Sequence, residues 1–89
     1  MNASTIRYDN TNYTITGNIV LSKNIGDLIG VIKKNVNDFP KENYEANNNI
    51  EVGTKLYKIK NENITNAIVV KENNNYFKAV IMKYIKSTK

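Results

Sequence analysis

The last third of the chain consists of three apolar runs that are separated by short polar segments. The runs cover residues 54–60, 67–71 and 76–82, and the segment between the last two contains the triple asparagine 73–75. β-Branched and aromatic residues favour strands, whereas asparagine clusters are typical of tight turns. The pattern predicts successive antiparallel strands, with the hairpin over 67–85 as the centre of the fold.

The order of apolar and polar residues within these runs predicts which faces the strands bury. Tyr57 and Ile59 fall on one face of their strand, and Lys58 and Lys60 on the other, because side chains alternate along a strand. The run 67–71 is apolar on both faces, which favours a fully buried strand in the middle of the sheet.

The beginning of the chain repeats this pattern in a shorter form. Apolar residues at 6 and 8, and again at 13 and 15, flank the polar segment 10–12. Such alternation on both sides of a turn indicates a hairpin with one buried face. Asparagine suits this turn because it tolerates the left-handed backbone that tight turns need.

The middle of the chain is compatible with two kinds of element. Ser22 can cap one or two helical turns, but Gly26 and Gly30 argue against a long helix. The apolar residues of 28–36 suit either a helix face or a strand. Their β-branched content and the two glycines favour the strand.

Residues 37–49 form the most polar stretch and contain the only proline. Pro40 fits the first position of a short helix over 41–46. A surface loop is the equal alternative, and its low apolar content predicts high mobility. Loops of this length often bind ligands, although a solvated connection is the simpler interpretation.

Few side chains of this stretch are able to fix it to the core. Phe39, Tyr44 and Ile50 are the large apolar or aromatic residues that could pin it. If the loop over 37–50 binds a partner, its exposed aromatic and amide side chains are the expected contacts. We therefore consider Tyr44, Asn47 and Asn48 as candidate ligand-contact residues.

A chain of 89 residues has the length of one domain. We expect this domain to span residues 1–89, with frayed ends at 1–5 and 86–89. Six or seven short strands indicate a mainly β protein, in which a small antiparallel sheet curls into a roll or barrel with at most one or two short helices. A β-rich α+β fold is the alternative.

The composition provides little for catalysis or metal binding. The chain has no histidine and no cysteine, which removes the commonest general base and the main zinc ligands. Its four glycines form no phosphate-binding loop. Asp38, Glu42 and Glu45 lie close in sequence, and we interpret them as solvated acids. We therefore predict a non-enzymatic protein without catalytic, cofactor-binding or metal-binding residues.

The net charge of +5 raises the question of a nucleic-acid partner. The basic residues are twelve lysines, spread along the chain, and the single arginine Arg7. Nucleic-acid readers rely on the planar fork of arginine, so we interpret the lysines as a solvated surface and do not expect nucleic acid as the partner. Tyrosines on predicted strands usually pack their rings toward the core. These are Tyr8, Tyr13, Tyr57 and Tyr76.

Three segments of the second half share a recognisable pattern. Residues 53–60, 67–71 and 76–79 read GTxLYxIK, AIxVK and YxxA. Together with residues 25–31 and the tyrosine-rich first hairpin, the pattern resembles small extracytoplasmic domains of Bacillus- and Clostridium-type bacteria, which are often anchored as lipoproteins. One departure is Asn61, at a position where the pattern suggests glycine.

The resemblance implies a non-enzymatic binding or interaction module on the extracytoplasmic face of a low-GC Gram-positive cell. No apolar run of the sequence has the length of a membrane span, so a tether outside this sequence would anchor it. The expected partner is a protein, peptide or envelope component, bound through an exposed sheet edge or the 37–50 loop. The alternative is an intracellular nucleic-acid-binding module with a cytoplasmic location.

Overall fold

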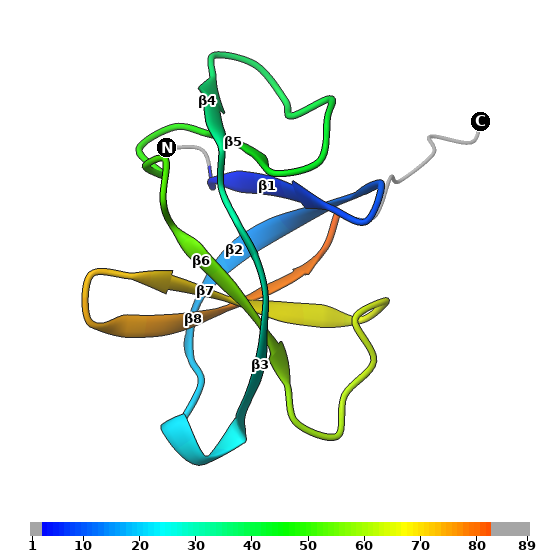
Figure 1. The fold of residues 1–89 in the computed structure, drawn as a ribbon, viewed down its shortest axis with the longest axis vertical. Helices are drawn as coiled ribbons and strands as arrows, with labels where there is room; N and C mark the ends of the chain where they lie inside the picture. The colour runs from blue at the N-terminus through cyan, green and yellow to red at the C-terminus, as the bar shows by residue number, and fades with distance from the viewer. Residues whose placement is uncertain (1–2, 83–89) are drawn as a thin grey trace, which may run out of the picture.

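A computed structural model of the protein describes residues 3–82, which form one curled, eight-stranded β-sheet and a short helical turn (Figure 1). The sheet has the shape of a half-barrel. The prediction of a mainly β, curled sheet with at most one or two short helices is therefore confirmed. The elements are β1 (Thr5–Tyr8), β2 (Thr11–Ile19), the 3-10 turn η1 (Ser22–Asn24), β3 (Ile25–Val31), β4 (Lys34–Val36), β5 (Glu45–Asn47), β6 (Lys55–Ile59), β7 (Ala67–Glu72) and β8 (Asn75–Ile81).

The strands follow one another across the sheet in the order β3-β6-β7-β8-β2-β1-β5-β4. Neighbours are antiparallel, as predicted, except for β4 and β5, which pair in parallel. The loop 37–44 makes this pairing possible, because it returns the chain to the level of the start of β4 before β5 begins. Register shifts in the β2–β8 and β3–β6 pairs add β-bulges, which bend the strands and increase the curl.

The chain between β3 and β4 borders both ends of the sheet. Only Ile32 and Lys33 separate these two strands, although the strands stand at opposite ends of the order. The Ile32 N–H donates to the carbonyl of Thr54 (2.8 Å), which prolongs the pairing of β3 with β6. The Lys33 N–H donates to the carbonyl of Tyr44 (2.8 Å), which prolongs the pairing of β4 with β5. One continuous segment therefore holds both ends together and keeps the sheet curled.

Both predicted hairpins are present, and short polar residues supply the left-handed positions of their turns. Between β1 and β2, Asp9 and Asn10 have φ angles of 54° and 60°; between β7 and β8, Asn73 has a φ of 57°. Asn61, where the sequence pattern suggested glycine, has a φ of 63°. Asparagine and aspartate visit this region more readily than other side chains, so these turns are tight without glycine.

The core consists of two apolar clusters to which β7 contributes alternate residues. Ile68 and Val70 belong to the larger cluster, and Ala67 and Val69 to the smaller one. All four side chains are buried. Because β7 is covered on both faces, the β7–β8 hairpin is the centre of the fold, as predicted. The larger cluster contains the buried residues Ile6, Tyr13, Ile32, Ala46, Ile50, Leu56, Ile68, Val70 and Ala79, and the smaller one contains Ile59, Ala67 and Val69.

The structure corrects the expectation for the polar stretch 37–49. No helix forms over 41–46, and residues 45–47 form the buried strand β5 instead of part of a loop. The strand lies between β1 and β4 in the sheet, and the side chain of Ala46 is buried in the larger cluster. Even Glu45 is only 8% exposed. Ile50, one of the residues expected to pin the stretch, is buried in the larger cluster.

The other segments agree more closely with the sequence analysis. The region 28–36 contains strand β4 and most of β3 and no helix, and η1 supplies the short helical turn after Leu21. Thr5 begins β1 and is buried, so the fraying expected for residues 1–5 does not extend to it. The end 86–89 and the last residues of the predicted 67–85 hairpin lie outside the described residues.

The carboxylate of Glu45 is expected to make the stability of the fold depend on pH. Backbone N–H groups of Lys41 and Glu42 donate to its Oε1 at 2.9 and 3.2 Å, and they hold the pKa of Glu45 below its ordinary value of 4.5. Hydrogen bonds to the charged form favour that form. The charged carboxylate therefore stabilises the fold fully above pH 4.5, and this contribution is lost as the pH falls through the lower pKa of the folded state.

We expect Glu45→Gln to be less stable than the wild type at neutral pH and to lose less stability in acid. Thermal unfolding of both proteins at a series of pH values from neutral to below 4.5 measures this difference. The matched control is Glu51→Gln, because Glu51 is exposed. If the unfolding temperatures of Glu45→Gln and the wild type change in parallel with pH, the charged carboxylate of Glu45 does not stabilise the fold.

Candidate functional site

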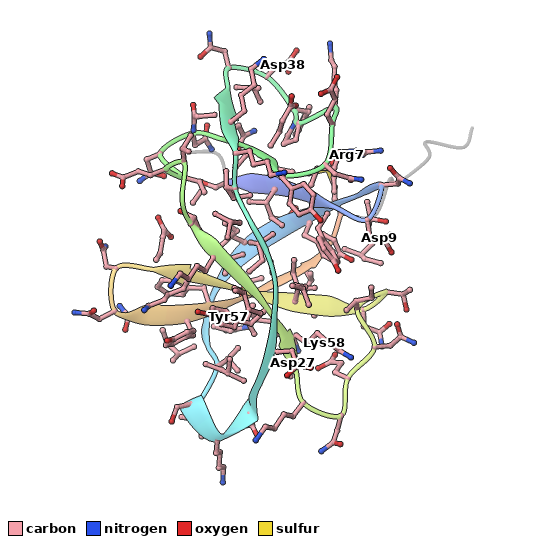
Figure 2. All side chains as sticks on the ribbon, in the orientation of Figure 1. Arg7, Asp9, Asp27, Asp38, Tyr57 and Lys58 are labelled. Atoms are coloured by element: carbon pink, nitrogen blue, oxygen red, sulfur yellow. The ribbon has the colours of Figure 1, made fainter. Side chains whose placement is uncertain are left out.

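A pocket of about 410 Å³ lies where β1 and β2 meet the ends of β4, β5 and β8. Its volume falls within the range of about 300–1,000 Å³ that is typical of small-ligand sites. Figure 2 shows one of its residues, Asp38, at the end of the molecule that carries β4, far from Tyr57 on β6. We call this cavity the Phe39 pocket. Its lining residues are Ala3, Thr5, Thr14, Asn37, Asp38, Phe39, Asn47, Asn48 and Met82.

Phe39 is the most unusual residue of this pocket, because its side chain is 56% exposed. The next residue, Pro40, is buried, and its carbonyl accepts a hydrogen bond from Nδ2 of Asn12 (3.3 Å). On the other side, Oδ1 of Asp38 accepts the Phe39 N–H at 2.7 Å. Phe39 was one of the residues that could pin the loop to the core, but its side chain is exposed and the neighbouring Pro40 is buried instead. The phenyl ring is instead presented to solvent from a braced backbone.

Two of the three predicted ligand-contact residues, Asn47 and Asn48, line the pocket. Asn47 is the last residue of β5 and is 9% exposed; its Oδ1 accepts the backbone N–H of Thr5 at 2.8 Å. Asn48 is exposed and left-handed, with a φ of 55°, and its Nδ2 donates to the carbonyl of Ala3 at 3.2 Å. One wall of the pocket is therefore fixed by hydrogen bonds between β5 and the start of the chain.

The third predicted residue, Tyr44, is not part of the Phe39 pocket. Its ring is half-buried and packs edge-on against Tyr8, with 6.1 Å between the ring centroids. Nζ of Lys33 lies 5.0 Å from the Tyr44 centroid. The ring also fills the space beside Gly30, where a Cβ atom would come within 2.5 Å of Cε1. These contacts give Tyr44 a packing role, whereas the sequence analysis considered it as a ligand-contact residue.

The other tyrosine pair has a similar arrangement. Tyr57 and Tyr76 pack edge-on with centroids 5.7 Å apart, and Nζ of Lys71 lies 5.5 Å from the Tyr76 centroid. Single-stranded nucleic acid needs free ring faces for its bases. Because lysines lie over the rings of Tyr44 and Tyr76, these rings are poor stacking platforms.

The ionisable groups give no indication of catalysis at the pocket. Burial raises the pKa values of Tyr8 and Tyr13, and neither residue lines it. The Tyr13 hydroxyl donates to the carbonyl of Ile64 at 2.7 Å, which is a structural bond between β2 and the 60–66 turn. Within residues 3–82, no group of three or more acidic residues is placed to hold a metal ion. The arrangement is suited to binding by hydrogen bonds and aromatic contact.

Most of the residues that line this pocket were not predicted from the sequence. Ala3 precedes β1, Thr14 lies on β2 and Met82 follows β8. Only the fold brings these three residues together. Phe39 carried a usable signal, since a phenylalanine before a proline in a polar stretch has no apolar neighbours with which to form a buried face.

Comparison with known proteins gives no relative for this chain: it matches no protein-family model, no curated protein and no solved structure. No helix in the described part of the chain has the length and apolar character needed to cross a membrane.

Proposed function

We propose that the protein is a non-enzymatic binding module on the extracytoplasmic face of a low-GC Gram-positive cell. The resemblance of residues 53–60, 67–71 and 76–79 to small anchored domains of such bacteria supports this location. The partner is a protein, peptide or envelope component, and its contact site is the Phe39 pocket.

The exposed ring of Phe39 carries the proposal for the site. An exposed phenylalanine loses apolar contact with the protein, and single exposed apolar residues are common. Here, however, the ring borders a pocket, and Pro40 and Asp38 brace its backbone on both sides. Aromatic residues at the centre of an interface often provide most of the binding energy. A hydrogen-bonded backbone at this position also reduces the conformational freedom that is lost when a partner binds.

The test is binding of the purified protein to isolated envelopes of a Bacillus-type bacterium. We expect Phe39→Ala to weaken this binding at least about tenfold, because truncation removes the aromatic anchor. The same variant should change the free energy of unfolding by less than about 0.5 kcal/mol, because the ring is exposed. Leu28→Ala is the matched control, since Leu28 is 53% exposed and lies outside the pocket.

Each part of the proposal has its own contradicting result. If Phe39→Ala binds envelopes as well as the wild type, the pocket is not the contact site. If the wild-type protein binds no envelope preparation, the location is wrong. Binding of a single-stranded oligonucleotide that persists at physiological salt would favour the intracellular alternative, because weak electrostatic binding disappears under that condition.

A further inference from the structure

We infer that the Phe39 pocket binds a neutral, hydroxyl-rich sugar chain, an inference that rests on the proposed function and names its ligand class. The charges of the pocket lining favour a neutral ligand. Lysine is abundant in this chain, yet none of the lysines among residues 3–82 lines the pocket, and neither does Arg7. Asp38 is the one charged side chain that the described residues contribute to its lining. A phosphate or carboxylate ligand would meet this acid without a balancing cation from residues 3–82, which favours a neutral ligand.

The kind of polar group that the pocket presents also favours a hydroxyl-rich ligand. Asn37, Asn47 and Asn48 contribute side-chain amides to the lining, and an amide combines a carbonyl acceptor with an N–H donor. Hydroxyl groups also donate and accept. Amides therefore pair with hydroxyls in either direction, and Asp38 adds two further acceptor oxygens.

The state of Asn47 strengthens this argument. Its Oδ1 already accepts the Thr5 N–H, and its Nδ2 donates to no other residue of the described chain. The bond to Thr5 fixes the plane of the amide. The nitrogen of a nearly buried side chain is thus left as a pre-oriented donor at the pocket wall, which suits the oxygen of a ligand hydroxyl.

An aromatic ring, that of Phe39, lines the same pocket as these polar groups. One face of a sugar ring is formed by C–H groups, and this face packs on the electron-rich face of an aromatic ring. Phe39 offers such a ring, and Met82 adds an adaptable apolar contact in the same pocket. Among residues 3–82, no lysine lies over the Phe39 ring, in contrast to the rings of Tyr44 and Tyr76.

The test is a titration of the isotope-labelled full chain, followed by amide NMR signals, with neutral tetrasaccharides: cellotetraose, maltotetraose and chitotetraose. A glycerol-phosphate polymer and an alanine-rich peptide are the comparison ligands. We expect at least one tetrasaccharide to shift the signals of Phe39, Asn47 and Asn48 and to compete with envelopes for the protein.

Two substitutions of the same residue separate a sugar contact from general apolar contact. Phe39→Tyr keeps the ring and should retain tetrasaccharide affinity. Phe39→Leu keeps apolar bulk without a ring, and it should weaken the affinity about tenfold, the equivalent of about 1.4 kcal/mol. Both variants should fold, because the side chain is exposed. Equal affinity of the leucine and tyrosine variants would contradict a sugar contact.

The outcomes distinguish this inference from the proposed function. If no tetrasaccharide shifts these signals while the peptide or the phosphate polymer does, the sugar assignment is wrong and the binding module stands. If envelopes bind in a manner that depends on Phe39 but no tetrasaccharide competes, the sugar assignment is again overturned. If the tetrasaccharides bind and envelopes do not, the ligand class holds and the proposed location falls.

Discussion

Ile68→Ala should lower the free energy of unfolding by about 2–5 kcal/mol, the usual cost of truncating a fully buried isoleucine. Ile68 lies on β7, its exposure is 0%, and it belongs to the larger core cluster with its cross-strand partner Ala79. A small domain is stable by only about 5–15 kcal/mol, so this one change removes a large part of the total. Urea denaturation, followed by tyrosine fluorescence or circular dichroism, measures the difference.

The matched control is the same substitution at Ile19, which is 53% exposed on β2. We expect Ile19→Ala to remain within about 0.5 kcal/mol of the wild type, because surface substitutions rarely exceed that value. Equal effects of the two substitutions would mean that β7 does not occupy the centre of the sheet. A change in the slope of unfolding against urea, without a change in midpoint, would point instead to an altered denatured state.

Apolar periodicity was sufficient to predict the strands that bury apolar side chains. The alternation at Tyr57 and Ile59 is reproduced, since both residues belong to or pack against the smaller cluster. The two hairpins were predictable for the same reason, and their turns follow from the tolerance of asparagine and aspartate for positive φ. In each case the information lies within a few residues of sequence, where patterns are most reliable.

Strand β5 was not predictable in this way, because it buries polar side chains. Its sequence is Glu45-Ala46-Asn47, which has the composition of a loop. The buried side chains are satisfied from outside the strand: Glu45 accepts from the backbone of Lys41 and Glu42, and Asn47 accepts from Thr5, which is 42 residues away in sequence. A pattern of neighbouring residues contains no record of a donor as distant in sequence as Thr5.

The candidate site shows the same limit. Asn47 and Asn48 were selected because the 37–50 stretch is long and polar, and both line the pocket. Tyr44 was selected for the same reason, but its ring packs beside Gly30 and Tyr8. Which side of the sheet a loop residue reaches depends on how the sheet curls. That curl depends on the backbone hydrogen bonds of residues 32 and 33 to both ends of the sheet, which no local motif specifies.

The packing of Tyr44 against Gly30 leads to the second prediction, that Gly30→Val lowers the free energy of unfolding by about 1–3 kcal/mol through overpacking. A Cβ atom on Gly30 would come within 2.5 Å of Cε1 and 3.1 Å of Cδ1 of Tyr44. The ring cannot move away freely, because Tyr8 packs against it and Lys33 lies over it. The backbone of Tyr44 is also fixed, since its N–H donates to the carbonyl of Arg7 at 2.7 Å. Gly17→Val is the control, because no atom lies within 4 Å of a Cβ at Gly17.

A double-mutant cycle with Tyr44→Asn tests whether the cost comes from this contact. Asparagine is the partner substitution because Tyr44 has a φ of 71°, a left-handed conformation that asparagine tolerates. With the ring removed, the valine at position 30 has space, and its β-branched side chain favours a strand. We therefore expect Gly30→Val to cost much less in the Tyr44→Asn background than in the wild type. If the cost is the same in both backgrounds, the ring of Tyr44 does not occupy the space beside Gly30, and its assignment as a packing residue is wrong.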